Sequence, residues 1–460
     1  MKWLAFLTLL TFAGLVALAQ VQPRLAISRN TNKTVVISWP ATNTGFVMQE
    51  ATTPAMSNWL GCASSPLFDP TNEVFTVSVP TANTSRFYRL APAPVSINLG
   101  TPQAIFKYGN TNAMGLFNVP DMHLAVLQQT DNSYLVWITG NINTNGGSVA
   151  LLKTTNFLNY QNIGPGSPTQ AEAVFTPSWD GVNMNDPNRT NIDSDYVGAN
   201  TVITATNGHD QLMFYEAGTK TFGGTNYGHG VGEYNVLALA RSTNNGLSWT
   251  RQGAVISGFD PRPDGPPGTS QPGISEPGMI ATNGYMYMFF QYIPNKANEP
   301  EAPSVIQVAR AAVASDGAPG AWTNFYNNSW SQPSLGGHAD TIVATSSTNG
   351  CTRAVEMWPA YNTYLNAYVL LFLANEGWFF STSTNLLTWT APMFFMPEPM
   401  FQNCQPMDWN YIFVTPGNAP GVIGQTGYVL YAHTDQKGLG CGTFLPHELW
   451  MRPFTFTRYP

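Results

Sequence analysis

Short segments in which apolar and polar residues alternate, separated by turns rich in Asn, Gly and Pro, recur along most of the chain. Alternation with a period of two is typical of β-strands that bury one face. Two of the turns are Asn207-Gly208 and Asn283-Gly284, and Asn-Gly between two apolar segments is a strong signal for a hairpin. No segment keeps a helical period. The pattern predicts an all-β protein.

A longer repeat runs through residues 98–460. Apolar segments lead into polar turns of the form Asn-x-Leu-polar-aromatic, and the aromatic residues follow one another at intervals of about 60 to 90 residues. A strand-built repeat of this length is typical of a β-propeller whose blades carry long loops. We therefore predict a five-bladed β-propeller over residues 98–460. The aromatic residues are Tyr160, Trp249, Trp322 in a looser copy, Trp389, and Trp450 at the end of the last unit.

Residues 21–91 contain a separate set of alternating segments, and residues 92–97 form a Pro-containing linker. We predict a small β-sandwich here, preceding the propeller. The segment resembles the fibronectin-type-III or immunoglobulin-like modules of exported bacterial proteins. We expect it to act as a spacer, and sugar binding through Trp39 or Tyr88 is the alternative.

The first residues have the features of a signal peptide. Met1-Lys2 is positively charged, an apolar stretch follows, and Ala17-Leu18-Ala19 is a small-x-small cleavage pattern. We predict a signal peptide over residues 1–19 and a secreted or periplasmic protein that begins at Gln20. The apolar stretch is shorter than the roughly 20 residues that span a bilayer, and no later segment is long and apolar enough, so we expect no membrane span.

The composition of the chain limits the classes of partner that it can bind. Charged residues make up only 10% of the chain, the formal net charge is −7, and no basic run is present. Because nucleic-acid binding depends on clustered Lys and Arg, we expect no nucleic-acid partner. We expect a monomer.

The cysteines and histidines imply no cofactor and no catalytic metal, since neither type shows a metal-ligand spacing, although a structural cation near the channel stays open. In an oxidising compartment we expect Cys404 and Cys441 to form a disulfide and Cys62 to be buried and free.

Three carboxylates stand at the beginning of the predicted innermost strands of the first three blades: Asp121, Asp195 and Glu276. These strands line the central channel of a propeller, so their first residues meet at one mouth. Glycosidic cleavage needs one protonated acid and one ionised base or nucleophile. A third carboxylate raises the pKa of the acid and orients the sugar.

The motifs around these residues resemble those of the five-bladed glycoside hydrolases of families 43, 32, 68 and 130. Pro120-Asp121-Met122 is similar to their blade-one motif, and Ser275-Glu276-Pro277-Gly278 to their acid motif. Gly337-His338 is similar to the start of a late blade in family 43. The resemblance implies an exported glycoside hydrolase with Glu276 as acid, Asp121 as base or nucleophile, and Asp195 orienting the sugar.

Several assignments have alternatives. Asp193 could take the place of Asp195, and Asp186, followed by Pro187, is a fallback for the family-32 motif. We expect His338, Arg262 and His123 to contact substrate. Arg262 lies in a Pro-rich loop before the Glu276 strand, and His338 is alternatively structural.

Two other functions compete with hydrolysis of neutral sugars. Residues 242–249 resemble the Asp-box of sialidases, but that motif reports a propeller turn, and the chain has few arginines to hold a sialic acid carboxylate. A non-catalytic sugar-binding propeller is the second alternative.

Overall fold

The computed structural model describes residues 24–29, 34–40, 46–53, 60–61, 67–69, 72, 74–80, 85–92, 95–107, 114–142, 145–178, 191–221, 232–260, 273–294, 304–343, 354–374, 377–397, 407–434 and 447–458. The expected signal peptide, all four cysteines with the expected Cys404–Cys441 pair, Asp186 and Arg262 lie outside these residues. Within the described residues the chain forms strands and one three-residue 3-10 helix, Val313–Ser315, which confirms the all-β prediction. No helix in this part of the chain is long and apolar enough to cross a membrane.

The strands before residue 93 form two small sheets. Alternate residues of one sheet, including Ile37, Trp39 and Phe75, are buried and form a common core. Phe75 also packs edge-on against Phe394, with ring centroids 4.5 Å apart, so this part of the chain contacts the larger body of strands. One sheet has the order β1(Ala26–Arg29), β2(Thr34–Pro40), β6(Val74–Pro80), β5(Leu67–Asp69); the other has β4(Leu60–Gly61), β3(Phe46–Ala51), β7(Phe87–Pro92).

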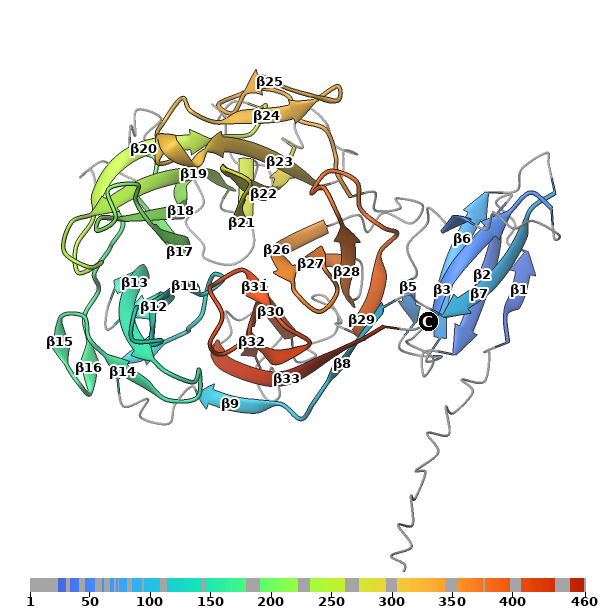
Figure 1. The fold of residues 1–460 in the computed structure, drawn as a ribbon, viewed down its shortest axis with the longest axis horizontal. Coiled ribbons are helices and arrows are strands. Elements are labelled where there is room, and N and C mark those ends of the chain that lie inside the picture. Colours follow the sequence, from blue (N-terminus) through green and yellow to red (C-terminus); the bar gives the residue numbers. More distant parts are fainter. Residues whose placement is uncertain are drawn as a thin grey trace, which may run out of the picture.

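The later strands form successive antiparallel groups around a common centre, and the first strand of each group lies nearest that centre (Figure 1). The groups are β11(Ala125–Gln128), β12(Tyr134–Ile142), β13(Asn145–Thr154), β14(Tyr160–Asn162); β17(Tyr196–Thr204), β18(Gln211–Thr221), β19(Gly232–Ser242), β20(Thr250–Ile256); β21(Gly273–Thr282), β22(Tyr285–Ile293), β23(Val305–Ala312), β24(Thr323–Tyr326); β26(Ala354–Asn362), β27(Ala367–Ala374), β28(Gly377–Ser383), β29(Met393–Pro397); and β30(Met407–Val414), β32(Thr426–Thr434), β33(Glu448–Arg458) with β8(Val95–Leu99).

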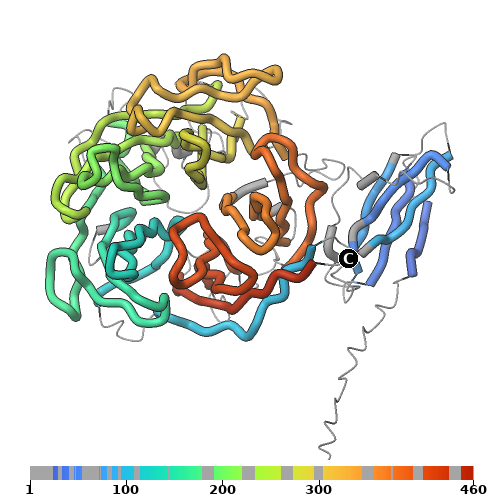
Figure 2. Tube along the Cα trace, in the orientation of Figure 1, coloured from blue at the N-terminus to red at the C-terminus, as the bar shows by residue number. Residues whose placement is uncertain are grey.

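The two ends of this ring are joined by strand pairing. β8 pairs with β33, with Ile97 opposite Phe456, and β9(Gln103–Phe106) pairs with the earlier part of β33. Figure 2 shows this early segment running beside the last strand of the chain. The ring therefore begins at Val95, inside the expected linker of residues 92–97.

Four aromatic residues of the repeat, Tyr160, Trp249, Trp322 and Trp389, lie at the turn between the third and fourth strands of a group, whereas Trp450 lies within β33. Trp249 Nε1 donates to the carbonyl of Gly246 at 3.1 Å, and Trp389 Nε1 donates to the carbonyl of Leu386 at 3.1 Å. Each tryptophan thus ties the start of an outer strand back to its own turn. This shared bond gives the repeat a physical cause.

The expected start of the fourth blade near Gly337-His338 is wrong. The innermost strand of the fourth group is β26, which begins later along the chain. Residues around His338 instead lie along the third group: the Asn324 side chain donates to Gly337 O at 3.1 Å, and Asp340 N–H donates to Phe325 O at 2.8 Å. The short hairpin of β24 and β25(Ser329–Pro333) turns the chain back onto that sheet, which the sequence pattern did not reveal.

Candidate active site

Four innermost strands carry a β-bulge, and a polar residue sits at each one. The register shifts at Asn200 in β17, Glu276 in β21, Glu356 in β26 and Asn410 in β30. Glu276, Glu356 and Asn410 have positive φ angles of 47°, 56° and 57°, which non-glycine residues adopt only rarely. Bulges re-aim side chains next to functional sites, and strained backbone clusters there too.

The Glu276 bulge ends at a glycine for a steric reason. A Cβ on Gly278 would lie 2.5 Å from the Met357 carbonyl oxygen and 2.5 Å from Pro359 Cδ. Only a residue without a side chain lets β21 approach β26 this closely. Gly278 therefore brings the backbone beside Glu276 close to the backbone beside Glu356.

Asn410 links the two glutamates. Its backbone N–H donates to Glu356 Oε2 at 2.8 Å. With the side-chain amide oriented to satisfy both of its groups, its NH₂ donates to Glu276 Oε2 at 2.8 Å, and its oxygen accepts from Met122 N–H at 3.0 Å and Trp409 Nε1 at 3.1 Å. One asparagine thus fixes two carboxyl groups and the segment that follows Asp121.

A third glutamate reaches the same place from the second strand of the second group. Glu216 is 5% exposed, and its Oε2 accepts from the Glu276 backbone N–H at 2.8 Å and from Ser275 Oγ at 3.2 Å. Its Oε1 accepts from Asn235 Nδ2 at 2.7 Å. These bonds hold Glu216 directly beneath the Glu276 bulge.

The crowding of carboxyl groups perturbs their protonation. Burial raises the pKa of Glu276 well above its ordinary value, and the negative charges of Glu216, Glu356 and Asp121 raise it further. Burial raises the pKa of Glu356 to about 8, partly offset by the hydrogen bond from Asn410 N–H. Glu356 therefore favours the protonated form near neutral pH, and the upward shift of the Glu276 pKa favours the protonated state that a general acid needs.

Asp121 lies just before β11, with its side chain 33% exposed. Its backbone N–H donates to Thr139 O at 3.0 Å, its carbonyl accepts from Tyr196 Oη, and its Oδ1 lies 3.5 Å from His447 Nδ1. Burial lowers the pKa of His447 to about 4, so the imidazole is neutral near pH 7. Asp121 is more accessible to solvent than Glu216.

His123 does not reach the solvent. Its side chain is 0% exposed, and its ring lies 5.8 Å from that of Trp358. Neither ring nitrogen makes a hydrogen bond of normal geometry to a described residue, and burial lowers the pKa of His123 to about 4. The substrate-contacting role expected for His123 stays a prediction, and in this structure it packs as a neutral ring behind Asp121.

Asp195 and His338 are the other described residues that were predicted for the site. Asp195 immediately precedes β17, where its N–H donates to Gly218 O at 3.1 Å and its Oδ2 accepts from Ser194 Oγ at 3.2 Å. His338 is exposed and stacks between two aromatic rings, with 3.8 Å between its centroid and that of Phe259.

Asp193, the alternative to Asp195, has a structural environment. It is 1% exposed and accepts hydrogen bonds from Arg251 Nε at 2.5 Å and Tyr215 Oη at 3.0 Å. Removing one partner of such a pair is destabilising, so these contacts give Asp193 a structural role in the second group of strands.

Sequence reasoning missed Glu216, Glu356 and Asn410. Each of the two glutamates is the only charged residue within an apolar run, Leu-Met-Phe-Tyr-Glu-Ala and Ala-Val-Glu-Met-Trp. Because ionisable residues are rarely buried without a function, that signal was present in the sequence. Nothing in the sequence marks Asn410.

Within the described residues, no group of three or more His, Cys, Asp and Glu side chains is arranged to hold a metal ion. The carboxyl groups of Glu216, Glu276 and Glu356 accept hydrogen bonds from N–H or O–H donors of the protein.

No family model matches the chain, and no curated protein matches it. Solved structures similar to it include the catalytic domain of a Coprinopsis cinerea GH62 α-L-arabinofuranosidase, with 13% identity over 79% of this chain and 98% of that chain and a TM-score of 0.43. The family 117 glycoside hydrolase Zg3597 of Zobellia galactanivorans has 9% identity over 79% and 90%, with a TM-score of 0.45. An α-L-arabinofuranosidase from Lactobacillus brevis has 10% identity over 74% and 91%, with a TM-score of 0.43. Structures this distant do not indicate a function for the chain, so the proposal below rests on the geometry of the cluster.

Proposed function

We propose that the chain is a glycoside hydrolase in which Glu276 protonates the leaving oxygen and Asp121 acts as base or nucleophile. The observation that carries this proposal is the position of Glu276 at a β-bulge, hydrogen-bonded to Glu216 and, through Asn410, to Glu356; burial and the neighbouring carboxylates, Asp121 among them, raise its pKa. Two carboxyl groups with opposite protonation states are what glycosidic cleavage requires.

In this proposal Glu216 and Glu356 help to raise the pKa of the acid, one of the two roles expected of a third carboxylate, and Asp195 keeps the other role, orienting the sugar. The ionised forms of both glutamates are among the causes that raise the pKa of Glu276, and both are joined to it by hydrogen bonds, Glu216 directly and Glu356 through Asn410. They are positioning residues, because they act on the acid rather than on the sugar.

The charge of the cluster also supports a neutral substrate. The carboxyl groups of Asp121, Glu216, Glu276 and Glu356 lie together, and those that are ionised would repel a negative charge on a ligand in this poorly solvated site. A uronic acid or a sialic acid would bring a further negative charge toward them. We propose neutral oligosaccharides or polysaccharides as substrates, which also disfavours a sialidase.

The wider organisation belongs to the same proposal. We propose that the ring is a five-bladed β-propeller, that the strands before it form a β-sandwich spacer, and that the chain acts as an exported monomer. The ring strands in the described residues support the blade count. Amino-terminal sequencing of the secreted protein should find Gln20 as its first residue.

The first experiment is a turnover screen. Purified protein is incubated with neutral aryl glycosides and with plant and algal polysaccharides, and released sugar is measured. Glu276→Gln keeps the shape but cannot donate a proton, so we expect it to lose about 100-fold or more of the turnover, as is usual for a general acid. Glu172→Gln is the matched control, because Glu172 is exposed. Turnover by Glu276→Gln at the wild-type rate would contradict the assignment.

A further inference from the structure

A cavity of about 450 Å³ opens beyond the carboxylate cluster, along the same innermost strands. Glu276 is near the beginning of β21, whereas Met279 and Thr282, later in that strand, and Asn283 directly after it line the cavity. Along β21 the first residue that lines the cavity, Met279, comes three positions after Glu276. Its volume is within the range of small-molecule binding sites.

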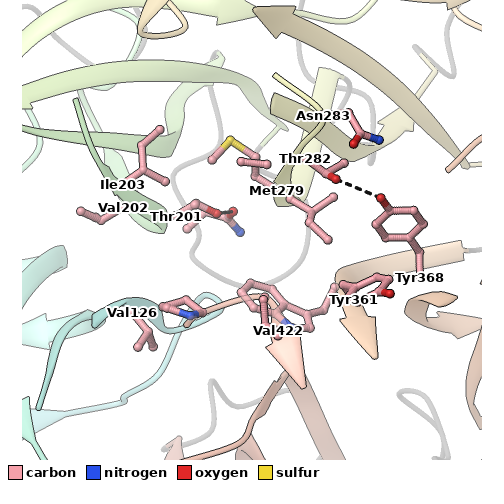
Figure 3. A pocket seen from close by; sticks show the side chains of 16 residues that line it. Val126, Thr201, Val202, Ile203, Met279, Thr282, Asn283, Tyr361, Tyr368 and Val422 are labelled. Carbon is pink, nitrogen blue, oxygen red and sulfur yellow. Dashed lines mark hydrogen bonds between the residues drawn. The ribbon is translucent and has the colours of Figure 1, made fainter. Parts of the chain in front are cut away.

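The walls of the cavity are uncharged. No Asp, Glu, Lys, Arg or His is among the described residues that line it. Figure 3 shows Tyr361 and Tyr368 on one side, with Thr201 facing them from another strand. The two tyrosine rings meet edge to face at a centroid distance of 5.3 Å, and the Tyr368 hydroxyl lies 3.0 Å from Thr282 Oγ1.

These walls determine what the cavity can bind. A charged ligand would lose its hydration without gaining a partner, so the ligand is neutral. The aromatic and aliphatic walls fit an apolar ring face, while the hydroxyl groups of Thr201 and Thr282 and the amide of Asn283 offer hydrogen bonds at its edge. A sugar ring combines an apolar C–H face with hydroxyl groups around its edge.

The cavity is also connected to the carboxylate cluster. Asn200 lines the cavity, and its amide donates to the carbonyl of Pro277, the residue that follows Glu276. Trp358 lines it as well, two positions after Glu356 in β26. The cavity therefore adjoins the cluster and shares β21 and β26 with it, but none of the cluster's carboxyl groups is among the described residues that line it.

We infer that this cavity is a second binding site, for a neutral monosaccharide or disaccharide, distinct from the site at Asp121 and Glu276. This inference does not depend on the proposed hydrolysis, because it concerns a different space and a different set of side chains.

The test is binding of D-galactose, L-arabinose, L-fucose and cellobiose, measured by saturation-transfer NMR and by titration of tryptophan fluorescence. Ala281→Trp places a large ring at the cavity wall, because Ala281 is an exposed residue among those that line it. Ala312→Trp is the matched control: Ala312 is also an exposed strand alanine in the same sheet but is outside the lining. We expect at least one sugar to bind the wild type and Ala312→Trp, and its Kd to rise tenfold or more in Ala281→Trp.

A second, smaller substitution keeps the test valid if Ala281→Trp fails to fold. Tyr368→Phe removes only the hydroxyl that bonds Thr282, and we expect it to weaken binding severalfold. If no sugar binds the wild type, or if binding is unchanged in both Ala281→Trp and Tyr368→Phe, the inference is wrong. Glu276→Gln should bind the sugar like the wild type, whereas loss of binding there would place the sugar at the carboxylate cluster and overturn the second site. Turnover of Ala281→Trp reports separately on the proposed hydrolase.

Discussion

Replacing Glu356 by Gln should change how the stability of the protein depends on pH. In the folded protein burial raises the pKa of Glu356 to about 8, against an ordinary value of 4.5. Between these two values the folded state keeps a proton that the unfolded state loses. The contribution is therefore fully present below about pH 4.5 and is lost as the pH rises through about 8.

The magnitude follows from proton counting. One extra proton in the folded state makes the free energy of unfolding fall by about 1.4 kcal/mol for each pH unit. The pKa of Glu276 is raised as well, so this glutamate adds a fall of the same sign. We expect Glu356→Gln to reduce the slope by about 1 kcal/mol per pH unit, since Gln cannot titrate.

The assay is urea unfolding followed by tryptophan fluorescence at about pH 5, 6 and 7 for wild type and variant. Glu172→Gln, at an exposed position, is the control and should leave the slope unchanged. Equal slopes for Glu356→Gln and the wild type would refute the claim that a buried, protonated glutamate occupies this position.

The packing of the strands yields further predictions. Gly278→Ala should destabilise the protein by about 1–3 kcal/mol in thermal unfolding and reduce turnover, because the new Cβ meets Met357 O at 2.5 Å. Gly424→Ala, where the nearest atom is 3.7 Å away, is its control and should change little. Asp193→Asn should cost about 2 kcal/mol, because Arg251 loses its partner, while the pH profile of turnover stays that of the wild type. A changed profile would give Asp193 a role at the site.

The strands and hairpins were the part of the structure that could be predicted from the sequence. Asn283-Gly284 forms the expected turn between β21 and β22, with φ angles of 50° and 78°, because both residues tolerate the left-handed conformation that the turn needs. The expected strand after Asp195 corresponds to β17. Local turn chemistry and period-two alternation act within a few residues, so they can be read from the chain.

The site depended on longer-range effects. Glu276 could be found because Ser-Glu-Pro-Gly precedes an alternating strand, but its bulge and its left-handed backbone come from packing against β26. Glu356 and Asn410 join it only when separate strands close around one centre. The fourth blade start was misplaced at His338 because a hairpin that folds back onto its own sheet leaves no distinct pattern of apolar residues.

The central claim is that Glu276 donates the proton to a departing sugar oxygen, and the dependence of rate on the leaving group tests it most directly. From an aryl glycoside, an acidic phenol departs as its phenolate without being protonated. A weakly acidic phenol departs readily only if a general acid protonates its oxygen. We predict that Glu276→Gln retains much of the wild-type hydrolysis rate on 2,4-dinitrophenyl glycosides of the preferred sugar. On the phenyl glycosides we expect its rate to fall by about 100-fold or more. An equal loss on both, or no loss on either, would contradict it.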